Sequence, residues 1–332
     1  MKTGKTKINK ERRMSNIADK NDVLAAKLYF TAAFPVMKIP LTEDPKQAKK
    51  FEKINAVVEF RAKDDENPLA CHVVFLTESK VEELNAKLKA EAENPDDVKE
   101  LKRFKVYQGE YDGRFDGVEH ILLEFKSIKS LLGVFKGNTP LEMLGIVMPL
   151  IKNITKKAMI PFLFLMLTLT KMMPNNNPSD QKPWEQYLKV KMSLYMITTA
   201  MSRATKFGWE PLVLWTAKQT DRIYQFKVGA TYDKNGKEIY PPIYAYLRVK
   251  AGKTKAGRGE YERKRPFVLF DFANPDGCLA VLSGRYEFVE AATRGCVAIV
   301  GAGDSYAVQF NNLMTKLQNM LIPSKFVDEI DV

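Results

Sequence analysis

Residues 121–138 and 268–285 align with each other without a gap, although they lie far apart in the chain. The first stretch reads ILLEFKSIKSLLGVFKGN and the second reads VLFDFANPDGCLAVLSGR. Each begins with alternating apolar residues, which is typical of a strand, and continues into a helix that ends near a glycine. A match of this kind indicates a tandem duplication, and the alternative is a chance similarity between two strand–helix segments. The sequence therefore predicts two similar folded units.

The stretch from Arg263 to Leu321 has the clearest pattern and reads as one folding unit. A strand is predicted at 266–272, and the Asn-Pro-Asp triplet that follows is suited to the start of a helix. Two short helices are then expected to end at Gly284 and Gly295, before a short buried strand at 296–300. The last helix carries one apolar stripe, formed by Tyr306, Phe310, Leu313, Leu317, Met320 and Leu321.

Helix breakers and turn formers cluster at 174–180, which reads PNNNPSD and marks a domain boundary. We therefore predict a disordered basic segment at 1–20, a first domain at 21–173, a linker at 174–183 and a second domain at 184–332. Within the first domain, residues 77–103 are very polar and are expected to form an exposed insertion between strands. Its last apolar helix is expected to be interrupted by Pro161.

The chain carries 52 Lys and Arg against 40 Asp and Glu, a net charge of +12, which permits attraction to an anionic partner. Its cysteines, Cys71, Cys278 and Cys296, lack the spacing of a metal site, so we expect buried thiols in a reducing compartment, the cytoplasm. His72 and His120 are the only two histidines, too few for most metal sites.

We find no signal peptide, because no apolar core follows the basic N-terminus. The apolar stretch from Met159 to Met173 is too short to span a bilayer. A buried helix is the favoured interpretation of this stretch, and insertion into a membrane interface is the alternative.

The segment FDFANPDGCLAVLSGRYEFVEAATRGCVAIVGAGDSYAVQFNNLM resembles the sterol carrier protein 2 family. Gly295, Val297, Ile299 and Gly301 stand where that family has a strand of the type G-x-V-x-I-x-G. The resemblance is good over about 221–321 and weaker over about 54–173. After Gly137 the first half departs from the pattern, because it has no clear equivalent of the 296–301 strand.

The resemblance implies an α+β fold with two tandem units, each a mostly antiparallel sheet covered on one face by helices. It also implies an apolar tunnel for a hydrophobic small molecule, namely a fatty acyl chain, an acyl-CoA, a sterol or a phospholipid. We place this tunnel between the sheet and the last helix of the second half. Its predicted walls are Val268, Phe270, Leu279, Phe288, Leu313, Leu317 and Met320. The alternative is that these residues fill a close-packed core.

The stretch KAGKTKAGRGEYERKRP is predicted to be a long, exposed, basic hairpin loop. Its basic residues are expected to hold an anionic headgroup or to dock on an anionic membrane surface or a protein. They are Lys250, Lys253, Lys255, Arg258, Arg263, Lys264 and Arg265. A plain solvent-facing loop is the alternative interpretation.

Three classes of function remain open: a lipid-binding protein for transfer or presentation, a non-catalytic partner subunit, and a nucleic-acid binder that uses the basic loop with Tyr246 and Tyr261. We do not expect an enzyme, because the sequence has no Gly-x-Ser-x-Gly elbow, no histidine-based triad and no metal cluster. No cofactor is expected either, because the Gly- and Lys-rich stretch 252–259 lacks the spacing of a phosphate-binding loop.

Overall fold

The computed structural model describes residues 18–64, 68–136, 147–171, 182–301 and 304–321. The chain forms two compact units. The first unit comprises Met1–Phe30 and Pro40–Met166, and the second unit comprises Thr31–Ile39 and Leu167–Val332. The expected disordered segment and the expected linker fall almost entirely outside the described residues.

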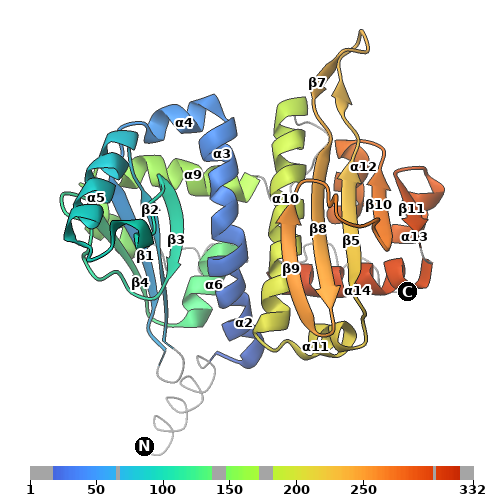
Figure 1. Cartoon of the computed structure of the whole chain (residues 1–332), viewed down its shortest axis with the longest axis horizontal. Helices are drawn as coiled ribbons and strands as arrows, with labels where there is room; N and C mark the ends of the chain where they lie inside the picture. Colours follow the sequence, from blue (N-terminus) through green and yellow to red (C-terminus); the bar gives the residue numbers. More distant parts are fainter. Residues whose placement is uncertain (1–17, 65–67, 137–146, 172–181, 302–303, 322–332) are drawn as a thin grey trace, which may run out of the picture. The chain divides into compact units, whose positions relative to one another are not determined.

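The first unit contains a four-stranded sheet with the order β3-β2-β1-β4 (Figure 1). Its strands are β1 (Ala56–Ala62), β2 (Leu69–Phe75), β3 (Phe104–Gln108) and β4 (Glu119–Phe125). β1 is parallel to β4, whereas β2 is antiparallel to both of its neighbours.

The second unit contains a five-stranded sheet with the order β11-β10-β5-β8-β9. Its strands are β5 (Arg222–Val228), β8 (Ile243–Lys250), β9 (Lys253–Arg258), β10 (Val268–Phe272) and β11 (Val297–Gly301). A separate two-stranded ribbon, β6 (Thr231–Tyr232) and β7 (Glu238–Tyr240), extends from β5 and β8. β5 is parallel to β10, so both main sheets are mixed, each with one parallel pair. The other neighbouring strands in the two sheets are antiparallel.

Four strands of each unit share one order and one register. The order β9-β8-β5-β10 in the second unit corresponds to β3-β2-β1-β4 in the first. Ala62 pairs with Phe125 in the first parallel pair, and Val228 pairs with Phe272 in the second. The two phenylalanines are also aligned in the sequence match of 121–138 with 268–285. Among the residues that the structure describes, the first sheet has no counterpart of β11.

The first unit begins with a continuous helical stretch, formed by α2 (Lys20–Leu28), η1 (Tyr29–Ala33), η2 (Phe34–Met37) and α3 (Lys38–Glu43). This stretch includes residues of the second unit. The further helices of the first unit are α4 (Pro45–Phe51), α5 (Glu78–Glu91), η3 (Pro95–Asp97), α6 (Ile128–Lys136), α8 (Val147–Asn153) and α9 (Met159–Lys171). Only the part of α9 up to Met166 belongs to this unit. The helices of the second unit are α10 (Pro183–Lys206), α11 (Glu210–Ala217), α12 (Pro275–Leu282), α13 (Phe288–Thr293) and α14 (Asp304–Leu321).

The helices that cover the equivalent faces of the two sheets pack through equivalent rings. Phe162 of α9 lies 5.9 Å from Phe60 of β1, and Phe310 of α14 lies 5.8 Å from Phe226 of β5. α9 is not interrupted by Pro161, contrary to the sequence prediction. The helix begins two residues earlier, so Pro161 lies in the first turn, where a missing N–H costs no helical hydrogen bond.

One described helical stretch, Lys20–Glu43, is long and apolar enough to cross a membrane, and 78% of its apolar window is buried. A core helix of a folded domain meets the same criterion. The stretch that the sequence singled out, Met159 to Met173, forms the shorter helix α9.

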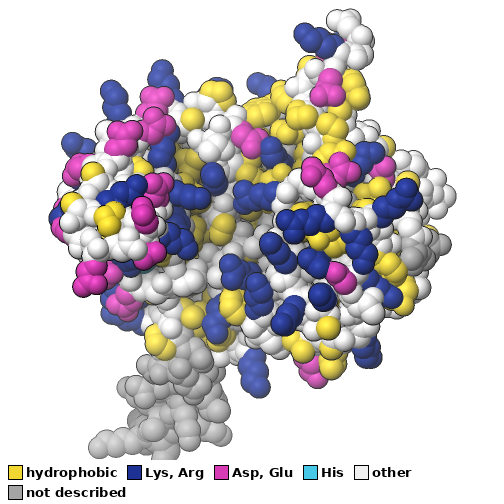
Figure 2. Space-filling model, in the orientation of Figure 1, with side chains coloured by type: hydrophobic (Ala, Val, Ile, Leu, Met, Phe, Trp, Pro, Cys, Tyr) yellow, Lys and Arg dark blue, Asp and Glu magenta, His cyan; other side chains and the backbone are white. Residues whose placement is uncertain are grey.

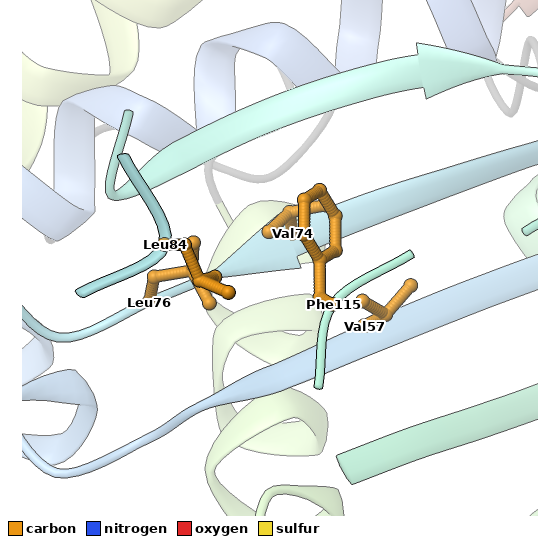
Figure 3. Close-up of a cluster of buried hydrophobic side chains, with 5 residues drawn as sticks. All are labelled: Val57, Val74, Leu76, Leu84 and Phe115. Carbon is orange, nitrogen blue, oxygen red and sulfur yellow. The ribbon is translucent and has the colours of Figure 1, made fainter. Parts of the chain in front are cut away.

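The second face of the first sheet is also covered, which differs from the predicted one-sided arrangement. Val57 and Val74 point from the sheet toward Leu84 of α5 and Phe115 of the β3–β4 connection (Figure 3). Leu84 is only 4% exposed, while most other α5 side chains face solvent. The insertion 77–103 is therefore only partly exposed, because α5 packs on this face of the sheet through Leu84.

Candidate functional site

An accessible cleft of the second unit lies beside β11, at the edge of its sheet. β11 pairs only with β10 among the described strands, with Phe270 opposite Ile299 and Phe272 opposite Val297. The cleft beside it has a volume of about 730 Å³, within the usual range for small-molecule sites. It is lined by Asp271, Ala273, Phe288, Val289, Ala292, Gly295, Val297, Ala298, Ile299 and Val308.

Small residues and a tight turn leave room for this cleft. Gly295 has a φ of +71°, which lets the chain leave α13 and enter β11 after only three residues, 294–296. The Cys296 N–H donates to the Ala291 carbonyl at 2.9 Å, which fixes β11 beside α13. The wall between them is formed partly by alanine and glycine, whose side chains fill little space.

Most of the cleft lining is apolar and accessible. Val289 is 66% exposed and Val308 is 37% exposed, so the cleft opens toward solvent. The sequence predicts a buried strand at 296–300, but only Val297 of this segment is buried. The prediction was wrong because β11 is an edge strand, whose remaining side chains border the cleft or the solvent.

The predicted tunnel walls fall into three groups in the structure. Phe288 lines the cleft. The side chains of Val268, Phe270, Leu279 and Leu317 are fully buried, and those of Leu313 and Met320 are partly exposed. Between the sheet and α14, the rings of Tyr224 and Phe310 stack at 4.7 Å. The cleft therefore borders α13 at the sheet edge, whereas aromatic rings pack between the sheet and α14.

Several lining residues were not identified from the sequence, notably Val289, Ala292 and Val308. All three are apolar residues on the exposed sides of α13 and α14, outside the buried apolar stripe of each helix. An exposed apolar position next to a glycine-ended helix was the available signal. A single such position is common on protein surfaces, so the signal was weak.

Asp271 is the charged residue of the cleft lining, and Lys227 neutralises it. The Lys227 ammonium donates to the Asp271 carboxylate at 3.0 Å. This hydrogen bond raises the pKa of Lys227, so the lysine stays charged. The cleft is consequently an apolar site with one compensated charge at its wall.

The basic stretch 250–265 is not one long loop, contrary to the sequence prediction. Its first part forms β9, which pairs with β8 through a tight turn at Ala251 and Gly252. The predicted exposure of its seven basic residues is confirmed. Figure 2 shows Lys and Arg side chains gathered over β8 and β9. Arg258 is held over the Tyr195 ring of α10, 4.9 Å from its centre.

The chain contains a second, shorter sequence repeat. Residues 109–111 and 259–261 both read Gly-Glu-Tyr. In the structure these triplets follow the edge strands β3 and β9. The Gly109 N–H donates to Ala70, and the Gly259 N–H donates to Tyr244, at 2.9 and 3.0 Å. The triplets therefore begin the connection that crosses one face of each sheet, from the edge strand β3 to β4 and from β9 to β10.

Each crossing connection covers a buried polar residue on the central strand. In the second unit, Gln225 accepts a hydrogen bond from the Tyr261 N–H at 3.0 Å. In the first unit, the carboxylate of Glu59 is fully buried and lies 2.8 Å from both Arg61 and His120. This cluster is not visible in the sequence, because its members are dispersed over β1 and β4.

His72, the other histidine of the chain, lies directly opposite Glu59 in the β1–β2 pair. Its Nδ1 lies 3.0 Å from the Gly109 carbonyl and donates to it, while its buried Nε2 has no hydrogen-bond partner. Burial lowers the pKa of His72, because a charged imidazole would lose its hydration. Burial at this position therefore favours the neutral form of the imidazole over the charged form.

Within the described part of the chain, no group of three or more His, Cys, Asp or Glu side chains could hold a metal ion. Cys71 and Cys278 are buried free thiols, and burial raises the pKa of both. Cys296 is a half-buried free thiol at the start of β11.

No family model matches the sequence, and no curated protein matches it. Among solved structures, the sterol carrier protein domain 2 of Helicoverpa armigera is 19% identical, covering 44% of this chain and 94% of that domain with a TM-score of 0.28. A conserved hypothetical protein of Thermus thermophilus, described as possibly a sterol carrier protein, is 16% identical over 38% of this chain and 83% of its own, with a TM-score of 0.27. A double mutant of the sec-alkyl sulfatase PisA1 is 9% identical over 55% of this chain and 26% of that chain, with a TM-score of 0.21. TM-scores of this size do not by themselves establish a common fold.

Proposed function

We propose that the chain is a lipid-binding protein, and that its second unit holds the apolar part of the ligand in the cleft beside β11 and α13. A fatty acyl chain, a sterol or a similar hydrophobic molecule fits this role. The observation that carries the proposal is an accessible cleft of about 730 Å³ with a mostly apolar lining. The sequence resemblance of 221–321 to the sterol carrier protein 2 family points to the same class of ligand.

The proposal includes a tandem origin for the two units. The common order and register of four strands, the Gly-Glu-Tyr triplets and the match of 121–138 with 268–285 support it. The units would have diverged at the fourth strand. In the second unit this strand is followed by β11 and the cleft. In the first, Asn153 of α8 donates its amide to the Leu122 carbonyl of β4 at 2.9 Å.

The basic hairpin of the second unit would attract the anionic part of a ligand or an anionic lipid surface. Its exposed lysines and arginines lie over β8 and β9, and Coulomb attraction to a negative surface adds with each charge. Binding and transfer require no catalytic group, so we propose a non-enzymatic role. A partner subunit with the same fold is the competing proposal.

The test is uptake of a fluorescent fatty acid by the full chain and by an Ala292→Trp variant. Ala292 is exposed and lines the cleft, so an indole at this position fills the cleft without disturbing the core. We expect at least a tenfold loss of affinity, because roughly 1.4 kcal/mol of apolar contact suffices for that change.

The matched control is Ala217→Trp, which adds the same side chain at an exposed position on α11 outside the cleft. It should bind the fatty acid like the parent protein. Equal binding by the parent and by Ala292→Trp would place the ligand elsewhere. No binding by the parent protein would leave the partner-subunit proposal as the better one.

A further inference from the structure

An exposed apolar surface occupies two consecutive helices of the first unit. Ile151 and Ile154, on α8 and the turn after it, are 57% and 63% exposed. Ile160 and Phe164, one turn apart on α9, are 55% and 49% exposed. We call these four residues the α8–α9 surface. Large apolar side chains occur singly on most proteins, but a group of four on adjoining helices calls for an explanation.

The core of the first unit does not account for this surface. α9 uses a different face for the core, because Phe162 and Leu165 are fully buried. Phe162 packs against Phe60 and Phe75, with ring centres 5.9 and 6.0 Å away. A helix that is apolar on all sides normally lies in an apolar environment. The core of the first unit supplies an apolar environment for one side of α9. Ile160 and Phe164 are apolar too, but they lie on its exposed side.

Lysines accompany the α8–α9 surface, three of them in the sequence and one in space. Lys152, Lys156 and Lys157 lie between its isoleucines in the sequence, and Lys50 of α4 places its ammonium 4.3 Å from the centre of the Phe164 ring. None of Lys152, Lys156 and Lys157 forms an ion pair with a carboxylate among the residues that the structure describes. Their charges therefore remain available to an anionic partner.

We propose that the α8–α9 surface docks the first unit on an anionic lipid bilayer. Apolar side chains that enter the acyl boundary, flanked by lysines at the headgroup level, are the pattern of an interfacial membrane helix. α9 has 13 residues and α8 has 7, so neither can cross a bilayer about 30 Å thick. The lysines favour a negative lipid surface over an apolar protein partner. This docking is independent of the cleft in the second unit.

The experiment measures co-sedimentation of the full chain with vesicles of phosphatidylcholine alone or mixed equally with phosphatidylserine. The parent should sediment with the mixed vesicles, and added salt should release part of it. Replacing both Ile160 and Phe164 with Ser should reduce vesicle binding by roughly tenfold or more, since two large apolar groups no longer leave water. Leu88→Ser is the matched control, because Leu88 is an exposed leucine on α5 of the same unit, and it should bind like the parent.

A second measurement distinguishes this surface from the basic hairpin of the second unit. An environment-sensitive fluorophore on Ile160→Cys, in a Cys296→Ser background, should shift to the blue on mixed vesicles, whereas the same label on Leu88→Cys should not. The proposal is overturned if the Ile160 label stays in water while the protein sediments. It is also overturned if the double Ser variant sediments like the parent, or if its only effect is to dissociate a dimer observed without vesicles. Fatty-acid uptake by the double Ser variant should be unchanged, so the outcome is independent of the cleft.

Discussion

Glu59 and Gln225 occupy equivalent places at the centres of the two sheets, and each unit satisfies this buried polar position differently. Gln225 anchors the crossing connection through backbone groups of Gly259 and Tyr261. Glu59 instead binds the side chains of Arg61 and His120. The sequence alone did not reveal this relation, because strand alternation shows which face a residue is on and not which partners cross the sheet.

His72 should make the stability of the folded chain depend on pH. Its folded-state pKa lies below the ordinary value of about 6.5, because protonation would create a buried charge and a buried Nε2–H without an acceptor. The unfolded chain therefore binds a proton at a pH at which the folded chain does not. The free energy of unfolding should be highest above about pH 6.5 and should decrease as the pH falls from there toward the folded-state pKa.

Urea unfolding at about pH 7.5 and about pH 5 measures this effect in the parent and in a His72→Asn variant. Asn keeps a donor near the Gly109 carbonyl and does not titrate. The parent should lose more stability between the two pH values than the variant. The same loss in both proteins would show that His72 does not contribute.

At the scale of elements, the sequence predicted those helices and strands that carry strong local signals. β10 and α12 formed as expected, and the Asn274 side chain caps α12 by accepting from the Gly277 N–H at 2.9 Å. β9 was missed, because glycines and lysines are rare in strands. Pairing with β8 and a contact between Thr254 and Ser202 of α10, 3.2 Å apart, stabilise the strand there. Such tertiary contacts are not visible in a local pattern.

The turn between β8 and β9 gives the second prediction. Ala251 and Gly252 have φ values of +44° and +79°, the left-handed region that hairpin turns require and that alanine adopts at a cost. Ala251→Asn should raise the free energy of unfolding by about 0.5–1 kcal/mol, because Asn-Gly is the preferred pair for this turn. Gly252→Ala should lower it by about 1 kcal/mol.

Chemical denaturation of the two variants beside the parent checks this prediction. The order of stability should be Ala251→Asn, then the parent, then Gly252→Ala. A less stable Ala251→Asn variant would contradict the account of the turn.

The position of the cleft shows the limit of prediction for the candidate site. Of the seven predicted tunnel walls, only Phe288 lines the cleft. A filled core and an open cavity use the same apolar residue types, so their difference lies in packing. Here the ring of Phe310 fills the layer under α14, and the space remains beside Ala292 and Val297.

At the scale of the whole molecule, the two units share the order of four strands but differ in what lies beside the fourth strand. The first unit covers the edge of β4 with α8, whereas the second unit adds β11 and the cleft. We propose a corresponding division of roles, in which the second unit holds the ligand and the first unit docks on the membrane through the α8–α9 surface. Each role has its own test, because no residue is shared between the two surfaces.

Native mass spectrometry of the full chain, purified under gentle conditions, tests the central claim most directly. The account predicts a bound mass that corresponds to a fatty acid, a sterol or another lipid. This mass should be absent from Ala292→Trp, in which the cleft is filled, and present in Ala217→Trp. A parent protein that carries no lipid, even after incubation with fatty acids, or a lipid mass that persists in Ala292→Trp, would contradict it.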